Sequence, residues 1–110
     1  DRASSISQGI IVATDGSTVT FNLDNGTIQQ ETLGGNRTLA LAGTLTVGRI
    51  FAIKLTQDAT GSRTVTWWSG ITWAAGSPPT LSTAATASDW FCFIIKGTNL
   101  YDGFILGQGM

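Results

Sequence analysis

"DWFCFIIK", residues 89–96, carries apolar side chains on both faces of a predicted strand. Successive side chains of a strand point to opposite faces, so these residues divide into two sets. One set is Phe91, Phe93 and Ile95, and the other is Trp90, Cys92 and Ile94. "GFILG", residues 103–107, has the same two-sided pattern, with Ile105 on one face and Phe104 and Leu106 on the other. A second apolar face indicates either a crowded monomer core or a subunit interface at Trp90, Cys92, Ile94 and Ile105.

The remaining segments also predict strands separated by turn signals. "GIIVATDGS" (9–17) and "STVTFNLDNG" (17–26) meet at Asp15-Gly16, which predicts a hairpin. "LTQDATGSRTVTW" (55–67) predicts a second hairpin, with Asp58 and Gly61 shaping its turn. A third, at "GTN" (97–99), joins the strand over 89–96 to "LYDGFILG" (100–107).

The domain predicted from these segments is all-β. We find no useful amphipathic helix and no internal repeat, and Gly and Pro interrupt the chain at short intervals. At 110 residues the chain is long enough for one hydrophobic core. We therefore expect a single antiparallel β-sandwich, jelly-roll-like, over residues 9–110, with residues 1–8 as an N-terminal tail from an upstream region.

The composition excludes several classes of partner. Charged residues make up 12% of the chain, the net charge is −1, and the basic residues are scattered. Such a surface is unsuited to holding nucleic acid through its phosphates. No apolar run approaches 18 residues, so no membrane insertion is expected.

Catalysis is also not expected. The chain has no histidine, which is the usual general base and the commonest metal ligand. Asp58, Asp89 and Asp102 could in principle pair as the two carboxylates of a glycosidase. Aspartates at turns more often fix the backbone, however, and no metal-binding motif is visible. We predict a non-enzymatic protein with no cofactor and no metal.

The tryptophans are the remaining candidates for a binding site. Trp67 shares a strand face with Val65 and is predicted to be buried, and Trp73 follows the same pattern. Trp68 falls on the face with two threonines and is predicted to point outward. Core or interface packing is the commoner role for tryptophan, but exposed rings beside polar side chains also form sugar platforms. The candidate glycan-binding residues are Trp68, Trp73 and Asp58.

The order of several motifs resembles a module of bacteriophage tail-fibre and other virion structural proteins. The motifs are "GNRTLAL" (35–41), "LTQDATGSRTVTW" (55–67), "GITWAAGSPPTLSTAA" (70–85), "DWFCFI" (89–94) and "YDGF" (101–104). The resemblance covers about residues 34–107. It departs at Trp68, where the module commonly has proline or a small polar residue.

The resemblance implies a β-sandwich-like domain of a homotrimeric fibre in the extracellular phage particle. The function expected from it is a terminal receptor-binding module that recognises a host cell-surface glycan. One alternative is a capsid-decoration or trimerisation module that binds other virion proteins. Another is a carbohydrate-binding module attached to an enzyme.

Overall fold

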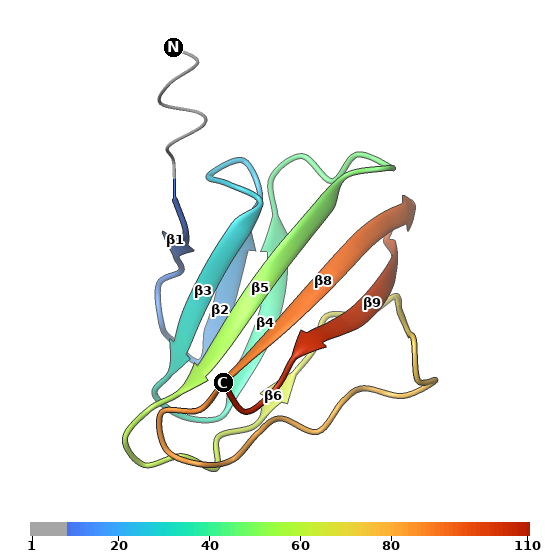
Figure 1. Cartoon of the computed structure of the whole chain (residues 1–110). Coiled ribbons are helices and arrows are strands. Elements are labelled where there is room, and N and C mark those ends of the chain that lie inside the picture. Colours follow the sequence, from blue (N-terminus) through green and yellow to red (C-terminus); the bar gives the residue numbers. More distant parts are fainter. Residues whose placement is uncertain (1–8) are drawn as a thin grey trace.

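The computed structural model describes residues 9–110, which form nine strands and no helix (Figure 1). The predicted tail over residues 1–8 lies outside the described residues. The strands are β1 (Ile11–Val12), β2 (Thr18–Asn22), β3 (Ile28–Leu33), β4 (Arg37–Ala42), β5 (Ile50–Gln57), β6 (Val65–Thr66), β7 (Ile71–Trp73), β8 (Ser88–Gly97) and β9 (Leu100–Gly107). The prediction of an all-β domain is confirmed.

The strands form two sheets. One has six strands in the order β1-β3-β5-β8-β9-β7, and the other has three in the order β2-β4-β6. In Figure 1 the smaller sheet lies behind β3 and β5. Residues with fully buried side chains come from both sheets, for example Phe21 of β2 and Phe93 of β8. The core therefore lies between the two sheets.

The first six strands alternate between the two sheets, so the chain winds as a flattened coil in which each turn has one strand in each sheet. The odd-numbered strands β1, β3 and β5 pair in parallel in the large sheet, and β2, β4 and β6 pair in parallel in the small one. Thr38 of β4 lies between Thr18 of β2 and Thr66 of β6, so a threonine occupies the same position in three successive strands of the small sheet. The structure thus contains a repeat that the sequence does not show.

This pairing corrects the predicted antiparallel jelly-roll. The segments on either side of Asp15-Gly16 do not form a hairpin, because β1 pairs with β3 and β2 with β4. The strands on either side of Asp58 also lie in different sheets. Asp-Gly and similar signals specify that the chain bends, but burial decides the pairing: Val19 and Phe21 are fully buried only because β2 faces the large sheet across the core. Antiparallel pairing is confined to β5 with β8 and to the predicted β8–β9 hairpin, which is confirmed.

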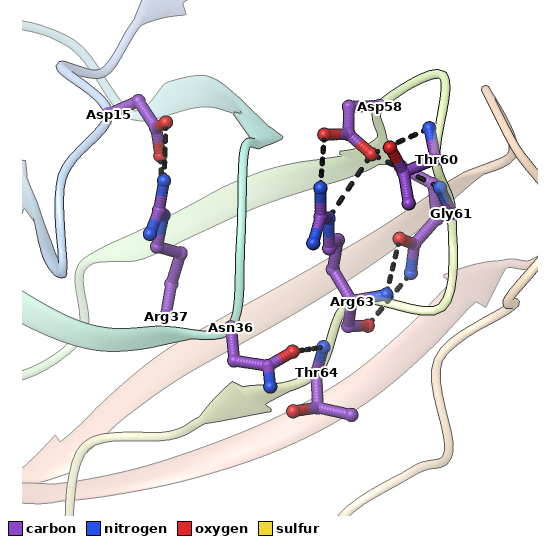
Figure 2. A network of polar contacts seen from close by, with 9 residues as sticks. Asp15, Asn36, Arg37, Asp58, Thr60, Gly61, Arg63 and Thr64 are labelled. Carbon is purple, nitrogen blue, oxygen red and sulfur yellow. Dashed lines mark hydrogen bonds and ion pairs between the residues drawn. The ribbon is translucent and has the colours of Figure 1, made fainter.

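Polar side chains tie successive turns of the coil together (Figure 2). Arg37 at the start of β4 donates two hydrogen bonds of 2.9 Å to Asp15, in the β1–β2 loop. One turn later, the side-chain oxygen of Asn36 accepts a 3.0 Å hydrogen bond from the backbone N–H of Thr64, just before β6. These contacts fix the loops that carry the chain from one sheet to the other.

A buried carboxyl group adjoins the first of these contacts. Glu31 on β3 is 1% exposed, and burial together with a hydrogen bond to Asp15 raises its pKa from 4.5 to about 8. The hydrogen bond from Arg37 holds the pKa of Asp15 well below its usual range. At neutral pH Glu31 is therefore protonated and donates to the Asp15 carboxylate, because two neighbouring carboxyl groups, one of them buried, do not both ionise.

Glu31 makes stability depend on pH. In the unfolded chain its carboxyl ionises near 4.5, whereas in the folded protein it keeps its proton up to about pH 8, so unfolding releases a proton between these values. We expect the free energy of unfolding to fall as the pH rises through this window. Glu31→Gln, which keeps a donor for Asp15, should flatten the fall. Urea unfolding at several pH values measures the slope, and an unchanged slope in the variant would assign the effect to another group.

Candidate functional site

The tryptophans at 67 and 68 both lie against the core. Strand β6 ends at Thr66, so the alternation of side chains stops before either ring. The centroid of the Trp68 ring lies 4.8 Å from that of Phe93 and 6.0 Å from those of Phe51 and Tyr101. The prediction that Trp68 points away from the core is therefore wrong, because the strand that would have turned it outward does not extend that far.

Trp73 is buried as predicted, and Trp67 packs against the core but is only half-buried. The Trp67 ring meets Phe91 at 4.9 Å and Trp73 at 5.0 Å, both edge to face. Trp73, the last residue of β7, is buried at 7% exposure. Edge-to-face packing of this kind fixes the rings against one another. The three indoles thus form one rigid cluster that is partly open to solvent at Trp67 and Trp68.

This cluster lines a series of hollows, which we call the tryptophan groove. The first, of about 690 Å³, is lined by residues 65–73 with Gly76 and Pro78. The second, of about 440 Å³, is lined by residues 73–75, 77–80 and 103–105. The third, of about 180 Å³, is lined by residues 63–65, 67, 78–81 and 83. Pro78 borders all three hollows, so the three lie around the same part of the β7–β8 loop, which stands away from the sheets in Figure 1. We call Pro78 and Pro79 the Pro78–Pro79 rib.

Asp58, the third predicted ligand residue, is committed to its turn (Figure 2). Its Oδ1 accepts hydrogen bonds from the backbone N–H groups of Thr60 and Gly61, at 3.0 and 3.1 Å. Arg63 donates to both carboxylate oxygens, at 3.2 and 3.0 Å. These contacts, with Arg63 the largest, lower the pKa of Asp58. The predicted part of Asp58 in shaping the turn is confirmed, and the structure does not bring it together with Trp68 and Trp73 around one hollow.

The other two candidate carboxylates also serve structural contacts. Asp89 is buried and accepts hydrogen bonds from the backbone N–H groups of Ser82 and Gly109, at 2.7 and 2.9 Å. Asp102 forms an ion pair of 2.8 Å with Lys96. Within residues 9–110, no group of three or more His, Cys, Asp or Glu side chains is placed to hold a metal ion.

Three of the four predicted interface residues lie on the outer face of the six-stranded sheet. They are Trp90, Cys92 and Ile94, each half-buried and alternating with the inward-facing side chains of β8. The fourth, Ile105, lies on the other face, because the β8–β9 register places it opposite the fully buried Phe91. There it borders the second hollow of the groove.

The outer face carries a continuous apolar row across four strands. The register aligns Ile28 of β3, Ala52 of β5, Cys92 of β8 and Phe104 of β9. Ile50 and Ile94 form a second apolar pair beside it. Of these side chains, Ile28 is 45% exposed, Ile50 56% and Phe104 37%. We call this surface the apolar outer face.

Comparisons with known proteins found no relative of this chain. A scan against family models gave no match, and searches of curated proteins and of solved structures gave none. Residues 9–110 include no helix of the length and apolarity that a membrane crossing needs.

Sequence reasoning missed two parts of these surfaces. One is the Pro78–Pro79 rib, for which the sequence does carry a signal, because two consecutive prolines restrict the backbone between β7 and the threonine-rich segment that follows. Ile28 and Phe104 could be joined to Cys92 only through the strand register, which sequence alone does not supply.

The position of Trp68 predicts a cost in stability. Trp68→Ala should lower the free energy of unfolding by roughly 3 kcal/mol, because it opens a cavity beside Phe51 and Phe93. Trp68→Phe should cost less than half as much, since it keeps an aromatic ring there and removes a buried indole N–H that has no partner. Urea unfolding compares the two, and equal stability of Trp68→Ala and the parent would contradict burial of this ring.

Proposed function

We propose that this chain is a non-enzymatic module of a bacteriophage virion, the terminal receptor-binding domain of a tail fibre. In this proposal three copies assemble, and each recognises glycan on the bacterial surface. The sequence motifs supply the virion context and the threefold assembly. The apolar outer face is the observation that carries the proposal, because it gives the chain a surface for assembly.

The apolar outer face suits contact between copies. It is built on the flat side of a sheet, where side chains of neighbouring copies can interdigitate. Monomeric proteins rarely expose continuous apolar surface of this kind. Two lysines border this face. Lys96 is paired with Asp102, which lies opposite Ile94. Lys54 lies with its Nζ 5.8 Å from the centre of the Trp90 ring, so its stem also covers apolar surface.

The tryptophan groove is the proposed recognition surface. Phe104 is the one residue that borders the groove and also belongs to the apolar outer face. Contact between copies through β3, β5 and β8 therefore leaves the rest of the groove accessible. A fibre module needs this separation, because assembly and receptor binding must occur at the same time.

The carboxylates support a non-enzymatic role. Asp24 accepts hydrogen bonds from Thr44 and Arg49, and the five other acidic side chains of residues 9–110 are engaged in the contacts described above. A general acid or nucleophile must be free to reach substrate. Here each carboxylate instead holds a turn, a loop or a neighbouring strand.

The assembly is tested by light scattering at micromolar concentration. We expect the parent protein to run as a trimer, and Ile28→Lys and Phe104→Lys to run as monomers, because each places a charge in the apolar outer face. Thr38→Lys, an exposed position on the small sheet, is the matched control and should remain trimeric.

A monomeric parent would overturn this proposal. If both Ile28→Lys and Phe104→Lys remain trimeric, the interface lies on another surface. Circular dichroism of each variant separates lost assembly from lost folding.

A further inference from the structure

We infer that the tryptophan groove binds a neutral oligosaccharide, laid around the Pro78–Pro79 rib. This inference rests on the proposed recognition of glycan and names the class of glycan. It follows from the shape of the groove, the side chains that line it and the distribution of charge.

The shape of the groove indicates a ligand longer than one sugar ring. The first hollow alone, at about 690 Å³, is in the range of about 300–1,000 Å³ that small-molecule sites occupy. It shares Trp73 and Pro78 with the second hollow, and Trp67 and Pro78 with the third. A ligand that fills the first hollow can therefore extend to either side without crossing a strand.

The walls of the groove combine indole rings with hydroxyl groups. Trp67 and Trp68 are each half-buried, so part of each ring stays open to the first hollow. Thr66 and Ser69, which both carry hydroxyl groups, line the same hollow, as does Thr72, whose hydroxyl accepts from Lys96. Sugar rings present C–H surfaces that pack on aromatic rings and hydroxyls that exchange hydrogen bonds with such side chains.

The rib is held in place before any ligand arrives. The side-chain amide of Gln108 donates a 2.9 Å hydrogen bond to the backbone carbonyl of Thr80. Pro78 and Pro79 fix their own backbone angles and carry no N–H that a ligand would have to satisfy. A site that is already formed loses less conformational entropy on binding.

The charge distribution selects a neutral ligand. Neither Asp nor Glu lines any of the three hollows, and the first two have no charged side chain. Arg63 borders the third, but both oxygens of Asp58 already accept from it. Lys96, which donates to the Thr72 hydroxyl, is paired with Asp102. An acidic sugar would lose water from its carboxylate without meeting a free cation, which is unfavourable.

The test compares neutral and acidic oligosaccharides on the full chain. A glycan array gives the overall preference, and calorimetric titration with maltotetraose, chitotetraose and tetragalacturonate measures representatives of each class. We expect binding confined to neutral glycans. Two variants at exposed positions in the groove, Thr66→Arg in the first hollow and Ala75→Trp in the second, should each weaken the binding of a neutral array hit at least tenfold.

Thr38→Arg is the matched control, because Thr38 is exposed, lies opposite Thr66 in the small sheet and borders none of the three hollows. It should bind as the parent does, and circular dichroism should show all three variants folded. Preferential binding of acidic glycans, or neutral binding unaffected by both groove variants, would overturn the inference and leave glycan recognition itself standing. Absence of binding to every glycan on the array would overturn both.

Discussion

The ring of Phe93 contacts four other aromatic rings, at centroid distances of 4.8 to 5.6 Å. One neighbour, Phe51, belongs to the adjacent strand of the same sheet. Trp67 and Trp68 belong to the segment that leaves the small sheet after β6, and Trp73 ends β7 at the far edge of the large sheet. The irregular segment 67–70 has few backbone hydrogen bonds to hold it, so aromatic packing on Phe93 determines where it lies. The floor of the tryptophan groove is therefore an extension of the core.

The positions of the strands could be predicted from the sequence far better than their pairing in the sheets. Alternation in β2 and β5 and the two-sided apolar pattern of β8 locate these strands, because burial of alternate residues is a local property. Pairing is a long-range property. Asp15 and Asp58 both mark sharp bends, and the same local signal serves a hairpin or a crossing between sheets. Which of the two occurs depends on which face of each strand becomes buried against the other sheet, and nothing near the bends indicates this.

For the candidate site too, local alternation was predictable and features that depend on strand ends or strand pairing were not. Trp73 lies in β7 and follows strand alternation, so its burial was predicted. Trp67 lies just beyond β6 and packs on the core side that alternation predicted, although it is only half-buried. Trp68 could not be placed, since its orientation depends on where β6 ends, and the ends of strands are weakly encoded. Ile105 was assigned to the wrong face because alternation within β9 does not say which set of side chains faces the core, and only the pairing of Ile105 with Phe91 decides it. Trp90, Cys92 and Ile94 were placed correctly by alternation within one strand.

Each turn of the coil is longer than the one before, as the register of Ile11 with Gln29 and of Gln29 with Ile53 shows. The segments that connect the strands have the same total length in these two turns, so the added residues lie in the strands, and β3 and β5 pair over more residues than β1 and β3 do. Beyond the coil, the β7–β8 connection that carries Pro78 belongs to neither ladder. Residues 75–79 of this connection can diverge without disturbing the ladders, whereas residues 82–86 are hydrogen-bonded to Gln57 and to the turn at Asp58. Under the proposed glycan recognition, sequence change in this one connection would alter the binding surface and keep the scaffold.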